Sequence, residues 1–162
     1  MRVAIIADTH MPRGRRRLPD ACVGQLREAD LIIHAGDLTG VSMLDQLRGY
    51  GEFAAVHGNA DEPAVRKQLP AQLELEVCGA RIAVVHDAGR REGGRERLRR
   101  AFPGADAVIF GHSHLPLHEA GDDGFQIFNP GSPTERRRAP HKTMGIADIT
   151  SGLLELKLLV LA

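Results

Sequence analysis

The stretch AVIFGHSH, residues 107–114, joins a run of four apolar residues to two histidines separated by one serine. A short apolar run rich in branched and aromatic side chains is typical of a buried β-strand. Side chains two positions apart on an extended chain point to the same side. His112 and His114 are therefore expected together beyond a strand end, either as metal ligands or as ordinary polar residues that close the strand. These eight residues alone leave both interpretations open.

Four other apolar runs stop equally abruptly at polar residues. They are VAII before ADTH, LII before HAGD, FAAV before HGNAD and IAVV before HDAG, and they begin at residues 3, 31, 53 and 82. Apolar residues at helical spacing occur at 20–28 and 41–48, between the first three runs, and at 93–102. Strands that alternate with helices predict an α/β protein with parallel strands at its centre.

The last third of the chain has a different pattern. Strand-like runs at 115–120, 125–128, 142–150 and 153–161 are separated by the turn sequences GDDG, NPGSP and SG. Turn residues of this kind connect antiparallel strands. We therefore expect an α/β sandwich, in which a mixed sheet begins as βαβαβ and ends in an antiparallel meander, with a second sheet beside it.

The composition predicts one globular domain over residues 1–162. Apolar residues make up 43% and charged residues 26%, and 21 Lys and Arg balance 21 Asp and Glu, so net charge favours neither nucleic acid nor a membrane. No segment is apolar enough for a signal peptide or a membrane span. We interpret Cys22 and Cys78 as buried or half-buried residues in a reducing compartment. A cytoplasmic protein is expected, and a homo-oligomer stays open.

Each predicted strand end carries residue types that bind metal ions. In chain order they are Asp8 and His10, Asp37, Asn59 with Asp61, His86, and His112 with His114. Functional groups of an open α/β sheet collect beyond the carboxyl ends of its strands, so these side chains are expected to meet. Gly36, Gly58 and Gly111 directly precede three of them, where the chain must turn sharply or let a ligand come close.

The mixture of donors indicates the kind of metal. Carboxylate, amide and imidazole groups suit Mn²⁺, Fe, Zn²⁺, Co²⁺ or Ni²⁺ better than Ca²⁺ or Mg²⁺. Without Asp61 the set contains seven side chains, which are too many for one ion but enough for two that share a carboxylate. The sequence thus indicates a centre of two divalent ions at one edge of the sheet.

In combination, these motifs resemble those of the calcineurin-like metallophosphoesterases. The motifs D-x-H at 8–10, G-D at 36–37, G-N at 58–59, the strand-end His86 and G-H-S-H at 111–114 occur in the family's order. The compact length and NPGS at 129–132 are most similar to its small single-domain phosphodiesterases of bacteria and archaea. The resemblance runs from residue 3 to about 149. It implies the family's α/β sandwich of two mixed β-sheets flanked by helices.

The resemblance also implies a role for each ligand. Carried onto this sequence, the family's positions give a first metal group of Asp8, His10 and His114. A second metal group consists of Asn59, His86 and His112. Asp37 would bridge the two ions. Mn is the ion we expect in assay, with Fe, Zn, Co or Ni as alternatives. A hydroxide bridging the ions would attack phosphorus in line with the leaving oxygen of a small phosphodiester. Asp37, Asn59 and His112 would then be the catalytic residues, acting through the ions.

One position departs from the broader family pattern. Many relatives have a histidine after the asparagine of the G-N motif, where it helps to protonate the leaving group, but this chain has Ala60. A general acid contributes about 10²–10⁴-fold to rate. We therefore predict slow turnover of alkyl monoesters and better turnover of activated diesters. His57 is a candidate for a substitute proton donor.

Four polar residues near the motifs have two interpretations each. Asp61 either supports the ligands or caps a helix near 62–68. Asn129 and Ser132 either brace the metal loops or contact phosphate. His34 either lines the site or is a hydrogen-bonded strand-end histidine, and we favour the second interpretation.

Three alternative functions remain. A phosphomonoesterase or a nuclease would use the same metals, and the basic clusters at 13–17 and 136–138 weakly support nucleic-acid binding, although aromatic residues are only 4% of the chain. An alternative of another class is a protein-interaction scaffold similar to a retromer subunit of eukaryotes, whose metal site is degraded. All seven ligand types are present in this chain, which favours an enzyme over a scaffold.

Overall fold

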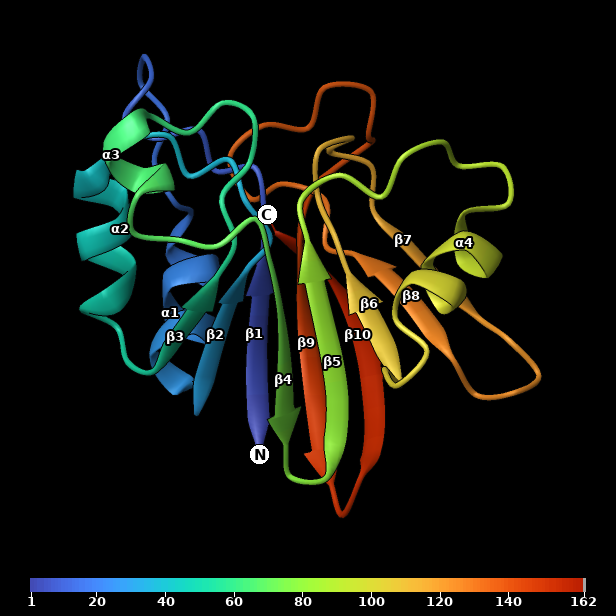
Figure 1. Ribbon diagram of the computed structural model, residues 1–162. Helices are drawn as coiled ribbons and strands as arrows, with labels where there is room; N and C mark the ends of the chain where they lie inside the picture. The colour runs from blue at the N-terminus through green and yellow to red at the C-terminus, as the bar shows by residue number, and fades with distance from the viewer. Residues whose placement is uncertain (162) are drawn as a thin grey trace.

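The computed structural model describes residues 1–161, which form two β-sheets with helices on their outer faces (Figure 1). The strand orders are β10-β9-β1-β2-β3 and β4-β5-β6-β8-β7. Both sheets mix parallel and antiparallel pairs, so the predicted α/β sandwich of two mixed sheets is confirmed. The elements are β1 (Arg2–Ile6), α1 (Asp20–Glu28), β2 (Leu31–His34), α2 (Val41–Arg48), β3 (Phe53–Ala55), α3 (Pro63–Arg66), β4 (Gln72–Val77), β5 (Ala80–Val85), α4 (Gly94–Ala101), β6 (Ala107–Ile109), β7 (Leu117–Ala120), β8 (Gln126–Asn129), β9 (Lys142–Thr150) and β10 (Leu153–Leu161).

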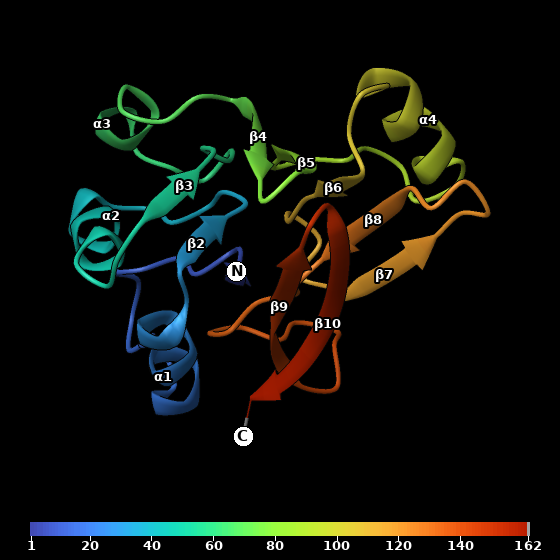
Figure 2. The ribbon, with the colours of Figure 1, turned by 90° about the horizontal axis from the view of Figure 1, so that it is seen from below.

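β1 is a continuous apolar run because both of its faces are covered. Val3 and Ile5 belong to the core between the two sheets, whereas Ala4 and Ile6 pack on the other side with residues of α1 and α2. A strand buried on both faces has no polar alternation. Figure 2 shows α1, α2 and α3 beside the first sheet and α4 beside the second.

The second sheet is covered in the same way by α4. Leu98 and Phe102, at the end of that helix, pack with Val108 of β6 and Ile127 of β8. The Arg- and Gly-rich segment therefore forms a helix with an apolar face, and this face packs against the second sheet. The predicted helix at 93–102 is found at 94–101.

Two expectations were wrong, and one strand was not predicted. The runs in the last third do not form one meander, because β7 and β8 pair in the second sheet while β9 and β10 form a hairpin that joins β1 in the first. β4 had no counterpart among the predicted strands, because its burial alternates along an edge strand instead of forming a continuous apolar run. Cys78 is exposed at the turn between β4 and β5, whereas Cys22 is buried.

The topology brings the ends of several strands to one edge of the molecule. β1, β2 and β3 are parallel in the first sheet, as are β5, β6 and β8 in the second. Figure 1 shows the arrowheads of β1 and β5 pointing to the same edge, and the long loops of both sheets gather there. Among the described helices, none has the length and apolar character needed to cross a bilayer.

Candidate metal centre

The seven predicted ligands come together at this shared edge. They follow β1, β2, β3, β5 and β6, so four ligands come from the first sheet and three from the second. Five are buried, whereas Asn59 and His112 are exposed. The centre therefore has a closed side inside the sandwich and an open side toward solvent.

The first metal group consists of Asp8, His10 and His114. The Nε2 atoms of the two histidines are 3.1 Å apart, and their rings stack with centroids 5.0 Å apart. Asp8 Oδ1 lies 3.4 Å from His114 Nε2 and 3.9 Å from His10 Nε2. Three donor atoms of the kinds that bind transition metals thus face one another in a buried space.

Asp37 connects this group with the second one. Its Oδ2 lies 3.8 Å from His10 Nε2 and 3.3 Å from His86 Nε2. Asn59 Oδ1 is in turn 3.2 Å from His86 Nε2 and 3.0 Å from His112 Nδ1. Asp37 is therefore placed between the two predicted groups, where a bridging ligand has to be.

The electrostatics of the two carboxylates differ. Burial, together with the charge of Asp37, raises the pKa of Asp8 to about 8, although the charge of His86 opposes this. Burial would also raise the pKa of Asp37, but the hydrogen bond and charge of His86 and the N–H of Ala60 lower it to about 2. The surroundings of Asp37 therefore keep its carboxyl group ionised. For Asp8, the neighbouring charges do not offset the effect of burial on the pKa.

The buried Asp8 carboxylate is a direct test of whether a cation fits. Neither of its oxygens accepts a hydrogen bond from the described residues, and Nδ1 of His114 also lacks a partner there. Buried polar groups without hydrogen bonds are rare, and a metal ion supplies the missing partner. The donor set and the orphaned oxygens therefore fit a divalent transition metal.

Hydrogen bonds fix the orientation of one predicted ligand, His86, and of a histidine behind the ligands, His34. His86 Nδ1 donates to the carbonyl of Ala35 at 2.8 Å, which leaves its Nε2 to face Asp37. On the other side, the fully buried His34 accepts from the N–H of Gly36 through Nδ1 and donates from Nε2 to the hydroxyl of Thr9, each at 3.1 Å. Burial lowers the pKa of His34 to about 3, so it is neutral. His34 lies behind the loop between Asp8 and His10 as a hydrogen-bonded strand-end residue.

Asp61 ties two ligand-bearing loops together, the one after β2 and the one after β3. Its carboxylate accepts hydrogen bonds from the N–H groups of Asp37 (3.1 Å), Thr39 (2.6 Å) and Gly58 (2.6 Å). It is not the cap of the following helix, since Glu62 occupies the N-cap position of α3. Of its two interpretations, the structure favours support of the ligands.

Asn129 and Ser132 face the backbone of the same loops. Asn129 Nδ2 donates to the carbonyl of Gly111 at 2.8 Å, just before the G-H-S-H motif, and Ser132 Oγ donates to the carbonyl of Asp8 at 2.8 Å. Both side chains are buried. Their contacts are those of braces for the metal loops.

His57 is the one predicted site residue that the structure does not join to the others. Its N–H donates to the carbonyl of Pro70, and its buried Nδ1 has no hydrogen-bond partner within residues 1–161. Asp87 also acts away from the centre, since its Oδ1 accepts from the N–H of Gly89 at 2.8 Å. Neither residue orients a predicted ligand.

The glycines before the ligands are required by close approach. A Cβ at Gly36 would lie 2.6 Å from His86 Nδ1, and one at Gly58 would overlap Asp37 Oδ1. Real Cβ atoms do not approach other atoms so closely. The loops of the two sheets can meet at the centre only because these positions lack a side chain.

Thr134 and Glu135, which no sequence motif indicates, also lie against ligand-bearing parts of the centre. Glu135 Oε2 lies 3.8 Å from His114 Nδ1 and 3.3 Å from Arg16, and Thr134 Oγ1 donates to the carbonyl of Thr9 at 2.8 Å. The charge of Arg137 adds to burial in lowering the pKa of His114 to about 4. Thr134 and Glu135 directly precede the basic cluster at 136–138, which contains Arg137, and the charges of that cluster alone do not indicate contact with His114.

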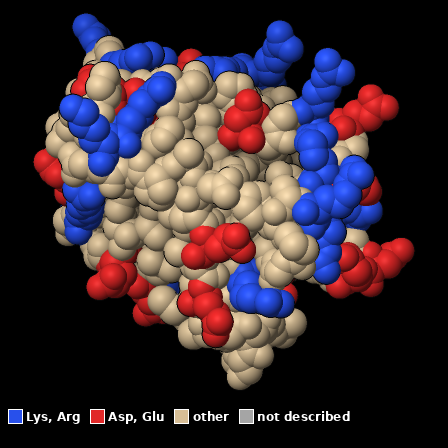
Figure 3. Space-filling model, in the orientation of Figure 1, with Lys and Arg blue, Asp and Glu red and all other residues tan. Residues whose placement is uncertain are grey.

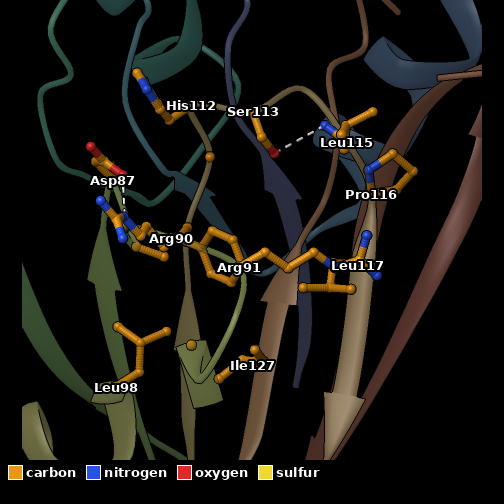
Figure 4. A pocket seen from close by; sticks show the side chains of 15 residues that line it. Asp87, Arg90, Arg91, Leu98, His112, Ser113, Leu115, Pro116, Leu117 and Ile127 are labelled. Atoms are coloured by element: carbon orange, nitrogen blue, oxygen red, sulfur yellow. Dashed lines mark hydrogen bonds between the residues drawn. The ribbon is translucent and has the colours of Figure 1, made fainter. Parts of the chain in front are cut away.

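Basic side chains lie around the rim of the centre. A hollow of about 490 Å³ is lined by Arg13, Gly14, Arg15, Arg16, Arg17, Thr134, Glu135 and Lys142. Figure 3 shows Lys and Arg side chains along the edge of the molecule that carries the site loops. A second hollow, which is largely apolar, adjoins His112 (Figure 4). The centre thus has two different hollows beside it, a basic one near His114 and a largely apolar one near His112.

The sequence profile and the curated proteins that match this chain are all phosphoesterases. The sequence profile of the calcineurin-like phosphoesterase superfamily domain matches residues 1–152. A probable metallophosphoesterase of Methanocaldococcus jannaschii is 36% identical over 140 residues, which cover 85% of this chain and 70% of that protein. One of Methanothermobacter thermautotrophicus is 33% identical over 139 residues, which cover 85% and 80%.

Solved structures share the fold. The crystal structure of wild-type Vps29 complexed with Zn²⁺ from Entamoeba histolytica superimposes with a TM-score of 0.78 and 21% identity, and each chain covers the whole of the other. At this identity the likeness concerns the fold alone. The two-sheet architecture is thus common to proteins that differ widely in sequence.

Proposed function

The chain belongs to the calcineurin-like phosphoesterase superfamily, and from this premise we propose that it hydrolyses phosphodiesters with two divalent transition-metal ions. Family membership makes it a phosphoric ester hydrolase. The preference for diesters, the number of ions and their identity are our proposal. We further propose that it acts as a single cytoplasmic domain on a small substrate.

The observation that carries this proposal is the buried Asp8 carboxylate, which accepts no hydrogen bond within residues 1–161 and faces two histidines. Asp8, His10 and His114 would hold one ion. Asn59, His86 and His112 would hold the other, and Asp37 lies where it could contact both. Such ions would supply Lewis acidity toward the phosphoryl oxygens and lower the pKa of a coordinated water, with Mn²⁺ expected in assay and Fe, Zn²⁺, Co²⁺ or Ni²⁺ as alternatives.

The chain's own residues contribute position and charge. Asp37 stays ionised at neutral pH because His86 and the N–H of Ala60 stabilise its charge. Asn59 and His112 are exposed, so a phosphate group reaches the centre from their side. The Asp61 carboxylate fixes the loops by accepting three backbone hydrogen bonds, which limits movement of the site during reaction.

Metal analysis combined with hydrolysis assays tests the proposal. We expect the purified protein to bind two Mn²⁺ per chain and to hydrolyse an aryl phosphodiester, with activity lost on chelation and restored by Mn²⁺. A protein that holds metal but hydrolyses neither a diester nor a monoester would contradict the enzymatic function and favour the scaffold alternative.

The absence of a proton donor at residue 60 leads to a prediction about the leaving group. We expect turnover of bis(4-nitrophenyl) phosphate to exceed that of glycerol phosphate by at least about 100-fold, since a general acid contributes about 10²–10⁴-fold for poor leaving groups. Ala60→His should raise turnover of the alkyl monoester more than that of the aryl diester. Equal wild-type rates on both substrates, measured at saturating Mn²⁺, would contradict the diester preference.

The arginine-lined hollow favours nucleic acid as a second candidate substrate. Its basic side chains belong to the segment 13–17 and to Lys142, and Arg16 is paired with Glu135 beside His114. If the protein is a nuclease, changing Arg15, Arg16 and Arg17 to Gln should abolish single-stranded DNA binding in low salt and leave hydrolysis of a small diester within about twofold. Unchanged DNA binding in a gel-shift titration would eliminate a nucleic-acid role for this cluster.

A further inference from the structure

A hollow of about 220 Å³ lies directly beside the centre, on the side of His112. One wall is the loop from Asp87 to Arg91, and the other is the segment from Phe110 to Leu117. Figure 4 shows His112 and Ser113 at one end and Leu98 with Ile127 at the other. We call this space the His112 pocket.

The His112 pocket is apolar within and polar at its rim. Leu98, Phe110 and Ile127 are buried core residues whose side chains form part of the lining. Asp87, Arg90 and His112, by contrast, are exposed. An apolar hollow with a few polar groups at one end is the usual form of a small-molecule site.

The wall formed by the loop is held in place by α4. The guanidinium of Arg97 donates to the carbonyls of Ala88 (2.7 Å), Arg90 and Glu92 (3.4 Å). Asp87 closes a turn at the start of the same loop through the N–H of Gly89. These contacts leave the pocket preformed, so a ligand entering it does not have to order the loop.

His112 connects the pocket with the candidate metal centre. Its Nδ1 is 3.0 Å from Asn59 Oδ1, and its ring lies edge-on to that of His86 at 5.2 Å, while the same residue lines the pocket. Arg90 and Arg91 also line it and are exposed, and Arg91 lies between Arg90 and Leu117 in Figure 4. A group bound in the pocket would thus be adjacent to a phosphate at the centre, with two cations nearby.

From this arrangement we propose that the His112 pocket binds an aromatic ester group of the substrate while the phosphate lies at the metal centre. A cavity of roughly 150 Å³ accommodates a benzene ring in another protein, so about 220 Å³ has room for one substituted ring. The cations at the rim complement the phosphate, which argues for a phosphoaryl compound over an uncharged apolar molecule. This inference rests on the proposed function, because it assumes that phosphate binds beside His112.

Two phosphonates that differ only in their single organic group test the inference. We expect the Mn²⁺-loaded protein to bind phenylphosphonate at least about tenfold more tightly than methylphosphonate in titration calorimetry, because only the phenyl group fills the pocket. Leu115→Gln combined with Leu117→Gln should reduce this ratio to below threefold and leave the affinity for methylphosphonate unchanged. Calorimetry does not depend on turnover, so it tests the pocket separately from catalysis.

Leu158→Gln is the matched control, because Leu158 is 40% exposed on β10 and Leu115 is 39% exposed at the pocket. It should keep the wild-type ratio. If the double variant does not fold by circular dichroism, Leu115→Gln alone is used, with a smaller reduction expected. Equal affinity for the two phosphonates in a protein that hydrolyses phosphodiesters overturns the pocket inference, and so does a ratio that the double variant leaves unchanged. If the wild-type protein does not hydrolyse phosphodiesters but still binds phenylphosphonate at least about tenfold more tightly than methylphosphonate, the proposed function is contradicted and the pocket inference is not.

Discussion

Asp37→Asn is expected to lower kcat/KM for an aryl phosphodiester by about 10²–10³-fold, the range seen when one electrostatic stabiliser is removed from an active site. The substitution removes a full negative charge, because the His86 hydrogen bond and the Ala60 N–H lower the pKa of Asp37 to about 2. Asp37 also lies between the two groups of ligands. Mass spectrometric metal analysis should therefore show fewer ions per chain, in addition to the loss of turnover.

A second variant separates this effect from misfolding. His112→Ala changes an exposed side chain, so it should fold normally and still lose metal and turnover. Asp45→Asn is the control for the charge change, since the Asp45 side chain is 67% exposed on α2. If Asp37→Asn and His112→Ala both kept the wild-type metal content and rate, the catalytic role of this centre would have to be abandoned.

His34 is expected to make stability depend on pH. Burial lowers its pKa to about 3 from an ordinary value of 6.5, so below pH 6.5 the unfolded chain binds a proton that the folded chain excludes. The contribution of neutral His34 to stability is complete above pH 6.5 and is lost as pH falls toward 3. Between pH 6.5 and 5.5 this loss is about 1 kcal/mol, since one pH unit corresponds to about 1.4 kcal/mol at most.

The measurement is urea unfolding of wild type and His34→Asn between pH 5 and 8, with a chelator present so that proton-linked metal binding does not contribute. The difference in unfolding free energy between the two proteins should be constant above pH 6.5 and shrink as pH falls below it. The exposed His141→Asn serves as the control. A difference that is independent of pH would show that His34 binds protons equally in the folded and unfolded protein, which would contradict the lowered pKa.

The correctly predicted strands and helices bury apolar side chains on one or both faces, which gives their sequences a clear apolar pattern. The helices at 20–28 and 41–48 and the strands at 142–150 and 153–161 have the predicted bounds. β4 could not be found by the same criterion because its burial alternates at a sheet edge. The division of the last four strands between two sheets depends on pairing of β8 with β6 and of β9 with β1, and a single sequence holds no local sign of such partners.

The ligands were predictable because they directly follow apolar runs, whereas their support was not. Asp61 lies within a motif, and its backbone contacts could be anticipated. Glu135, by contrast, is separated from His114 by 20 residues of chain and reaches it only because the segment after β8 crosses from the second sheet to the first. The same holds for Thr134 and its bond to Thr9. Long-range contacts of this kind follow from topology, and local sequence does not encode them.

Five of the seven predicted ligands have left-handed backbone conformations: Asp8, His10, Asp37, His112 and His114, with φ between 46° and 69°. Aspartate, asparagine and histidine tolerate this conformation better than most residues do. The same three residue types form the whole donor set, so the bends at the strand ends and the metal chemistry restrict the choice of amino acid together. Replacing one of these five ligands with Glu or Cys to obtain a different metal specificity would therefore also add a conformational cost at the strand end. Exchange of ligands one residue at a time changes the stability of the loops together with the metal chemistry.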